Sequence, residues 1–399
     1  MERIEMIQVE MFPANRGDCF LITLVEDDYR ILIDGGISQT YENYLKPRLL
    51  QLAEEGKVID LLIVTHVDDD HIGGIIALLK ENGTSTQAKV IPIKEVWHNS
   101  YRHLSLEKGS KAGFREEKIL KDIISNRSIR EQKEKETGEK QISAIRGTTL
   151  AGLLYKGGYC WNRTFREGAV CLDMLKEIQI TENATIKLLS PTKESIDKLG
   201  KYWAGELKKS KYDFCFSTEA YFDDAFEYYF RFLRESPFSE VEIASSVVKE
   251  ETLKQMIEKE MPRDVSPTNN SSIAFLLTYM GKKMLFMGDL CVDCLGNEEQ
   301  EKLDLIKVPH HGSGRNISMD FLKKYRAHYY LISTDGSIHR HPDAAVIAKI
   351  IAVNCEERKQ IFFNYSHEKL TRFCSKEMEE KYQCELIFPE ETDKVIVCI

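Results

Sequence analysis

The sequence lacks the features that mark a membrane or secreted protein. It contains no uncharged apolar run long enough to cross a bilayer. Its first twelve residues mix charged with apolar side chains, and they have neither the basic start nor the apolar stretch of a secretory signal. From these two absences we expect a cytoplasmic protein with no membrane association.

A disulfide framework is also missing. The ten cysteines are scattered along the chain, so we expect mostly reduced thiols that pack as small apolar side chains. Cys291 and Cys294 form a CxxC, but no second cysteine pair lies close to them in the sequence. Ordinary packing is therefore favoured over a zinc knuckle.

The sequence has no excess of positive charge. Its 55 basic and 64 acidic residues give a net charge of -9. Surfaces that bind nucleic-acid phosphates are usually basic, so this balance argues against a large one but leaves room for a local basic groove. The 399 residues, 42% hydrophobic and 30% charged, suit a globular protein with a large core.

Short apolar runs separated by turn residues predict strands in two parts of the chain. The first part reads as an antiparallel meander, then a buried strand, a helix and another strand, in residues 7–12, 19–25, 29–33, 59–64, 72–79 and 90–97. The second reads as strands with helices between them, in residues 273–279, 283–287, 305–308 and 329–333. Two such halves predict an α/β fold, a four-layer αββα sandwich.

Two stretches interrupt this pattern, and we interpret both as insertions into a single domain of residues 1–399. The first, about 101–180, is rich in lysine and arginine, and is either an exposed helical segment that binds nothing or a binding surface. The second, about 193–263, is helical and rich in aromatic residues, which usually form a core or a partner surface. A base-stacking platform is less favoured there, because stacking sites normally have basic residues alongside.

A group of metal-binding residue types follows the first buried strand. His66, Asp68, Asp70 and His71 lie within six residues of each other. Since a strand points alternate side chains to opposite faces, the chain must turn at Thr65 to present all four from a loop. Imidazole and carboxylate ligands suit zinc, manganese or iron, and four of them exceed the need of one ion. The segment predicts two adjacent metal ions, the alternative being an acidic surface turn.

Two later segments complete this set. Asp289 in LFMGD and His310 in KVPHHGS each follow an apolar strand, where a buried sheet would deliver them to one shared edge. A carboxylate such as Asp289 can bridge two cations with its two oxygens. His310 is the favoured ligand of the histidine pair, and His311 is the alternative.

Together these segments resemble the metallo-β-lactamase superfamily, most closely the hydrolase domain of ComEC-type DNA-uptake proteins. The resemblance lies in GDCFLI, ILIDGG, THVDDDHIGG, NNSSIAFLL, LFMGD, KVPHHGSG and HRHP. Asp68 stands where the common HxHxDH motif has a histidine, as in the ComEC-type branch. The run at 269–272 stands where many members place a further histidine. Both changes imply a harder site that accepts Mn²⁺ or Mg²⁺ more readily than a three-histidine zinc site does.

The resemblance also suggests supporting residues. Asp34 and Asp18 would orient the ligands by hydrogen bonds, or else only form turns beside glycine. His341 in HRHP would donate a proton or bind a phosphate oxygen, or else belong to a loop in which Pro342 starts a helix. Further residues for support or substrate binding are Asn270, Ser272, Lys307 and His311.

The predicted reaction is hydrolysis by a metal-activated water at two divalent ions, manganese or zinc, with magnesium as an alternative. Asp70 is the candidate to orient or deprotonate that water. The resemblance favours a phosphodiester substrate, so we expect a nuclease or phosphodiesterase that acts on nucleic acid or on another phosphodiester. Two alternatives remain: a hydrolase of a small ester, lactone, thioester or cyclic nucleotide, and a metal-stabilised sensor that binds a protein partner through the insertions.

Overall fold

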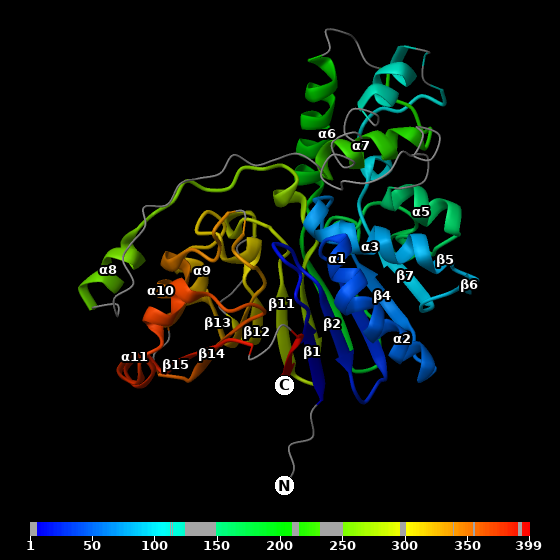
Figure 1. The fold of residues 1–399 in the computed structure, drawn as a ribbon. Helices are drawn as coiled ribbons and strands as arrows, with labels where there is room; N and C mark the ends of the chain where they lie inside the picture. Colours follow the sequence, from blue (N-terminus) through cyan, green and yellow to red (C-terminus); the bar gives the residue numbers. More distant parts are fainter. Residues whose placement is uncertain are drawn as a thin grey trace.

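The chain forms two facing sheets with helices on their outer sides (Figure 1). The structure is a computed structural model. It describes residues 6–111, 113, 115–123, 149–209, 215–231, 250–295, 301–337, 339–353, 356–389 and 393–399. This arrangement confirms the predicted α/β sandwich of four layers.

The first sheet has six strands and is built mainly from the N-terminal part of the chain. In spatial order they are β16 (Val395–Cys398), β1 (Ile7–Met11), β2 (Phe20–Leu24), β3 (Tyr29–Ile33), β4 (Ile59–Ile63) and β7 (Ile93–Trp97). The predicted antiparallel meander of β1 to β3 is confirmed. β3, β4 and β7 run parallel because helices connect them. All five residues of β4 are buried, as expected for a strand covered on both faces.

The second sheet has eight strands. They are, in spatial order, β15 (Cys384–Ile387), β14 (Lys359–Phe363), β13 (Tyr325–Ile332), β12 (Glu301–Lys307), β11 (Lys282–Phe286), β10 (Ala274–Tyr279), β9 (Ala184–Ser190) and β8 (Glu177–Gln179). The strands from β11 to β15 run parallel, and those from β8 to β11 antiparallel. β8 falls inside the stretch 101–180, so the sheet begins earlier in the chain than the apolar pattern indicated.

Helices cover the outer face of each sheet. The first sheet carries α1 (Ser38–Thr40), α2 (Lys46–Glu54), α3 (Asp69–Asn82) and α5 (Leu150–Gly157), and the second α8 (Glu250–Glu258), α9 (Met319–Lys324), α10 (Ala344–Ala352) and α11 (Lys376–Tyr382). A π-helical segment, η1 (Tyr41–Leu45), lies between α1 and α2. Short 3-10 helices are η2 (Tyr101–His103), η4 (Arg163–Phe165), η5 (Asn269–Ser271), η6 (Val292–Cys294), η7 (Pro309–Gly312) and η8 (Glu368–Phe373). A small separate sheet is formed by β5 (Gly83–Thr84) and β6 (Gln87–Ala88). None of the described helices is both long and apolar enough to cross a membrane.

Buried side chains from both sheets form the central core. Ile22 and Ile31 of the first sheet pack in one apolar cluster with Phe275 and Phe286 of the second. Two further apolar clusters lie outside this core, one between each sheet and the helices that cover it. Because both sheets are packed on two faces, the positions of the strand ends are fixed.

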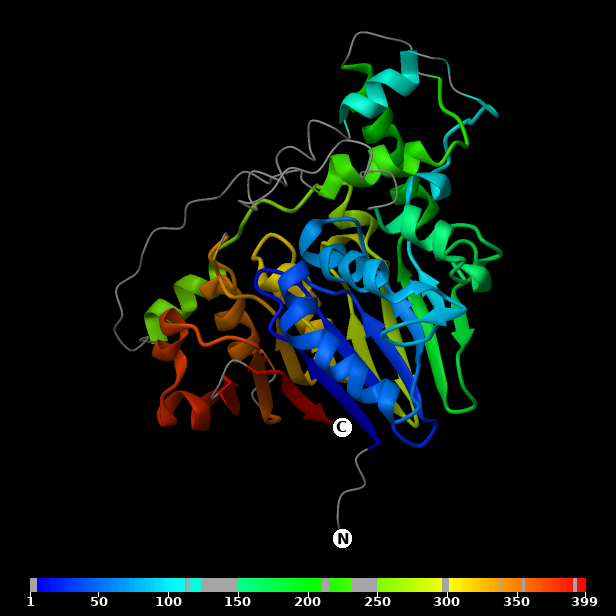
Figure 2. The same cartoon turned by 45° about the vertical axis from the view of Figure 1, so that its right-hand side comes forward.

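The aromatic residues of the second predicted insertion form a core of their own. α6 (Lys193–Lys208) and α7 (Tyr221–Arg231) lie together at one end of the sandwich (Figure 2). Trp203, Phe226 and Phe230 are buried between them. α8, from the same stretch, instead packs on α10, so residues 193–263 supply two separate parts of the fold. Tyr212, Phe214 and Phe232, and the basic residues beyond 123 up to 148, lie outside the described residues.

Buried acidic residues of α7 fix these helices to the sandwich. Glu227 accepts a hydrogen bond from the backbone N–H of Ala151 and lies 3.0 Å from His98 Nε2. Asp223 accepts from the backbone N–H and the guanidinium of Arg102. Since buried charges are stable only when paired, these contacts set the position of α7.

We predict that Trp203→Ala destabilises this end of the molecule by about 3–5 kcal/mol, because it leaves a large cavity in the aromatic core. Denaturant unfolding followed by circular dichroism measures the loss. Tyr155→Ala is the matched control, because Tyr155 is 67% exposed and should change stability little. An equal effect of both changes would contradict the aromatic core.

Candidate metal centre

The loop after β4 is shaped by Asp34, at the end of β3. The carboxylate of Asp34 accepts hydrogen bonds from the backbone N–H and the hydroxyl of Thr65, at 2.8 and 2.7 Å. These bonds end β4 and turn the chain toward α3, whose N-cap is Asp68. Gly74 lets α3 approach the backbone closely, because a Cβ atom there would lie 1.9 Å from the carbonyl oxygen of Gly35.

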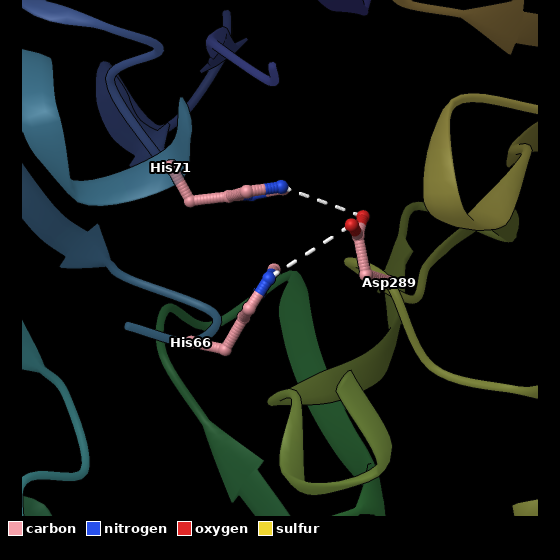
Figure 3. Close-up of side chains that lie close together, drawn as sticks. All are labelled: His66, His71 and Asp289. Carbon is pink, nitrogen blue, oxygen red and sulfur yellow. Dashed lines mark ion pairs between the residues drawn. The ribbon is translucent and has the colours of Figure 1, made fainter. Parts of the chain in front are cut away.

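Four histidines surround the carboxylate of Asp289, which follows β11. The distance from Nε2 to the nearer Asp289 oxygen is 3.4 Å for His71 and His311, 3.7 Å for His310 and 3.8 Å for His66. Figure 3 shows His66 and His71 pointing at this carboxylate from the loop and helix on the opposite side. The structure therefore brings the ends of β4, β11 and β12 to one place.

The geometry of this cluster fits bound metal. Two donors that are each about 2.1 Å from a tetrahedral ion are about 3.4 Å apart, close to the separations seen here. Within the described residues, the buried atoms with no hydrogen-bond partner include His66 Nε2, His71 Nε2, His311 Nε2 and Asp289 Oδ1. Buried polar atoms are normally bonded, so these orphaned atoms are in the positions expected of metal ligands.

Two carboxylates lie on the more exposed side of the cluster. Asp68 Oδ2 is 3.7 Å from His66 Nε2, and Asp70 Oδ2 is 3.8 Å from His311 Nε2. Their side chains are 25% and 21% exposed. Among the described residues, donor atoms lie within 4.8 Å of one another in the set His66, His71 and Asp289 and in the set Asp70, His71 and His311. The cluster thus has room for two adjacent ions.

Each histidine is held by its other ring nitrogen. The Nδ1 partners are Thr65 Oγ1 for His66, Asp34 Oδ2 for His71, Asn316 Oδ1 for His310 and the Ser333 carbonyl for His311, at 2.8 to 3.1 Å. Because a carbonyl oxygen only accepts, Nδ1 of His311 carries a proton, and Nε2, which faces Asp289, is the nitrogen that could bind a cation. Such outer contacts orient histidine ligands and make them more basic.

The buried charges of the site are strongly coupled. Burial acts to raise the pKa of Asp18, but Lys307 and His311 lower it to about 2. Burial likewise opposes ionisation of Asp289, yet the surrounding histidines hold its pKa well below the usual range. Burial lowers the pKa of His66 well below its ordinary value. Burial also acts to lower the pKa of His71 and His311, but Asp289 raises the pKa of His71 well above its ordinary value and that of His311 to about 9. A cation would therefore meet ionised carboxylates and one neutral imidazole, and it would have to displace protons from His71 and His311.

Lys307 is a buried cation beside the cluster, and its ammonium group already has two partners. Its ammonium pairs with Asp18 and donates to the carbonyl of Gly288 at 3.1 Å. It lies 3.9 Å from Asp289 Oδ1. Lys307 and Asp18 thereby brace the loops that carry Asp289 and His311.

Other predicted residues support the loops from further away. Asn270 accepts from the backbone N–H of Cys291, and Ser272 Oγ accepts from the backbone N–H of Asp289. The His341 ring lies 5.7 Å from that of His310, on the loop before α10, and burial lowers its pKa to about 4. Pro342 precedes Asp343, the N-cap of α10.

Several contributors were not predicted. Asp264 lies 3.3 Å from His310 Nδ1 and accepts from the side-chain amides of Asn269 and Asn316. Asp264 belongs to no recognisable motif, and only an aligned set of relatives would have singled it out. Thr65, by contrast, lies inside the recognised THVDDDHIGG segment, so its hydroxyl could have been predicted to hydrogen-bond a neighbouring ligand.

Asp69, between the two carboxylates of the loop, is held by two arginines. Arg231, at the end of α7, donates to Asp69 Oδ1 at 2.7 Å, and Arg16 lies 3.4 Å from Asp69 Oδ2. The Arg231 side chain is only 9% exposed. The helical insertion therefore contacts the loop of the candidate metal centre directly.

Residues 13–152 match the Metallo-beta-lactamase superfamily. The matched stretch contains Asp18, Asp34 and the loop from His66 to His71, and it ends before Asp289. The match, the sandwich and the His/Asp clusters together support a metal-dependent hydrolase. No curated protein matches the sequence.

We predict that Asp34→Asn weakens metal binding by about 10–100-fold, because the amide cannot accept all the bonds from Thr65 and His71. Titration of metal-free protein with Zn²⁺ in a calorimeter measures the change. Asp28→Asn is the matched control, since Asp28 has a similar backbone φ of 49° against 54° and lies on the surface. Unchanged affinity in Asp34→Asn would refute the supporting role of Asp34.

We predict that Arg231→Ala lowers metal affinity by about 10-fold, because Asp69 loses a buried partner and the loop is less firmly placed. The same titration measures this loss. Arg102→Ala removes a similar ion pair from the insertion without touching the loop. If both variants weaken binding equally, the effect comes from the docking of α7 and not from Asp69.

Proposed function

We propose that this protein is a phosphodiesterase or nuclease that uses two divalent metal ions, related to the ComEC-type branch. The observation that carries the proposal is the convergence of four imidazoles on Asp289, with Asp68 and Asp70 at the more exposed side. The proposed ligands are His66, Asp68, Asp70, His71, Asp289 and His310.

The donor set supports manganese or zinc, with magnesium as an alternative. Carboxylate oxygens suit hard cations, and imidazoles suit zinc and its neighbours. When bound, two divalent ions lower the pKa of water and neutralise the charge that develops on a phosphoryl group. Asp68 in place of a histidine supports the harder cations.

The residues of the chain have distinct roles in this proposal. Asp289 holds the two halves of the site together through its two oxygens. Asp70, partly exposed, orients the attacking water and accepts its proton. His341, beside His310, is the candidate to bind a phosphate oxygen through a ring N–H, because a pKa of about 4 leaves few protonated rings to donate a proton at neutral pH. Asp18, Asp34 and Lys307 keep the loops in place, with Asn270, Ser272 and His311.

An anionic substrate is supported by the charges at the exposed side. Arg16 is 35% exposed, and its Nε lies 3.9 Å from Asp70 Oδ2. Arg16 also pairs with Asp69, so a phosphate would share this guanidinium, which has donors for two oxygens at once. A sensor that binds a protein through its aromatic insertion has less support, because Trp203, Phe226 and Phe230 are buried.

The test is hydrolysis of single-stranded DNA, duplex DNA, RNA and bis-nitrophenyl phosphate, with Mn²⁺, Mg²⁺ or Zn²⁺ added in turn. We predict cleavage of at least one of these, and a loss of at least about 100-fold in Asp289→Ala, since contacts outside the ligand set alone are worth 10–100-fold. Asp293→Ala is the control, because that carboxylate is 50% exposed and pairs with Arg263.

Two outcomes would count against this function. If no phosphodiester is cut with any of the metals, the nuclease proposal fails. If a nitrophenyl ester or a thioester is cut instead, and Asp289→Ala abolishes that activity, the site is a hydrolase of the second predicted class.

A further inference from the structure

Tyr155, on α5, is the one aromatic side chain among the described residues that is mostly exposed, at 67%. Arg102 Cζ lies over its ring, 5.5 Å from the centroid. The same atom lies over the ring of Trp161, 4.5 Å from the centroid. Arginine stacked on aromatic rings combines a flat surface with positive charge. These three residues, called the aromatic platform below, therefore form a surface that suits another flat ring.

Two members of the aromatic platform are held firmly in place. Trp161 Nε1 donates to the carbonyl of His98 at 2.8 Å, and the two rings stack with centroids 6.0 Å apart. Arg102 Nη2 donates to Asp223 Oδ2 at 2.9 Å, and the backbone N–H of Arg102 donates to Oδ1 of the same carboxylate. Since these side chains are already ordered, a ligand that stacks on them loses less entropy on binding.

The charged side chains beside the aromatic platform are mainly basic. Lys156 follows Tyr155 on α5, and Arg163 and Arg166 lie in and directly after η4. All three are exposed, and Glu167 is the acidic residue of the same stretch. Basic groups beside exposed aromatic rings are the combination that binds single-stranded nucleic acids, because cations pair with the phosphates and rings stack with the bases.

The aromatic platform lies at the same edge of the first sheet as the candidate metal centre. β4 and β7 are parallel neighbours with Ile63 opposite Trp97, so the chain leaves both strands at one edge. The loop of the candidate metal centre follows β4, and η2, which contains Arg102, follows β7. Val67, inside that loop, is buried in the same apolar cluster as Tyr101, the neighbour of Arg102.

α7 connects the two places. It packs on α5 and η2, and its last residue, Arg231, donates to Asp69. Asp223, the partner of Arg102, precedes Arg231 by just over two helical turns, a rise of about 12 Å. A strand a few nucleotides long can therefore reach from the aromatic platform to the candidate metal centre.

We infer that the aromatic platform binds an unpaired base of a single-stranded nucleic acid, whose backbone continues to the candidate metal centre. The inference rests on the proposed phosphodiesterase for the fate of the strand, but binding of the strand is measured without hydrolysis. A duplex is a poorer ligand, because its bases are stacked on one another and their faces are covered.

The test measures binding of a fluorescent oligodeoxythymidine of about 12 nucleotides, within the usual site size. Its phosphorothioate backbone resists hydrolysis, and fluorescence anisotropy gives the dissociation constant for the protein loaded with Mn²⁺. We expect Tyr155→Ala to weaken binding by about 5–100-fold, the effect of losing one stacking contact. Tyr155→Phe should bind like the wild type, because the ring remains.

Met280→Ala is the matched control. Met280 is 47% exposed and follows β10, which starts beside Thr65 and runs away from the candidate metal centre. This variant should bind the strand like the wild type. Circular dichroism of each variant checks that the fold is preserved.

Two unlabelled competitors identify the ligand. The single strand should displace the probe at least about 10-fold better than a duplex of the same length or thymidine monophosphate, because it alone offers both unpaired bases and a row of phosphates.

Several results would overturn the inference. Wild-type protein that does not bind the strand, unchanged binding by Tyr155→Ala, or an equal loss in Tyr155→Phe each contradicts stacking on this ring. Equal displacement by thymidine monophosphate identifies a free nucleotide as the ligand, and equal displacement by the duplex identifies contacts to the backbone alone. If the binding pattern holds and no phosphodiester is cut, the inference stands and only the proposed hydrolysis falls.

Discussion

The burial of the Asp289 carboxylate is the constraint on which the rest of the site depends. A buried carboxylate must be compensated by opposite charge or by hydrogen bonds. Here it has four imidazoles around it and Lys307 at 3.9 Å, yet its Oδ1 accepts no hydrogen bond from the described residues. Three more carboxylates, Asp18, Asp34 and Asp264, are buried behind the histidines. This excess of negative charge is what two divalent cations would balance.

The sequence was sufficient for the parts of this arrangement that are local. The loop after β4 could be predicted because strand, polar cluster and helix follow one another within about 25 residues. Asp289 and His310 were found because each follows a clear apolar strand. The pairing of β16 with β1 could not be predicted, since it joins the two ends of the described chain. β8 and β9 were not predicted as strands, because polar residues flank them.

The distant supports of the site were the least predictable. Asp264 reaches His310 across 46 positions in sequence, and its side chain has no pattern of its own. The orientation of His310 and His311 depends on two left-handed residues, which residue type alone does not reveal, because histidine seldom adopts that conformation. Arg231 likewise touches Asp69 only because α7 is docked by Glu227 and Asp223.

The choice of metal depends on how these local and distant features combine. Read alone, Asp68 in place of a histidine makes the loop a harder ligand set and favours manganese or magnesium. The turn after β12 brings further imidazoles to the same carboxylate, since Nε2 of His310 and of His311 lie 3.7 and 3.4 Å from Asp289 Oδ2. Asn269, in the run where many members of the resembled superfamily place a further histidine, lies 3.4 Å from His310 Nδ1. On this reasoning four imidazoles remain around Asp289, and Asp68 changes the charge of the site more than its softness.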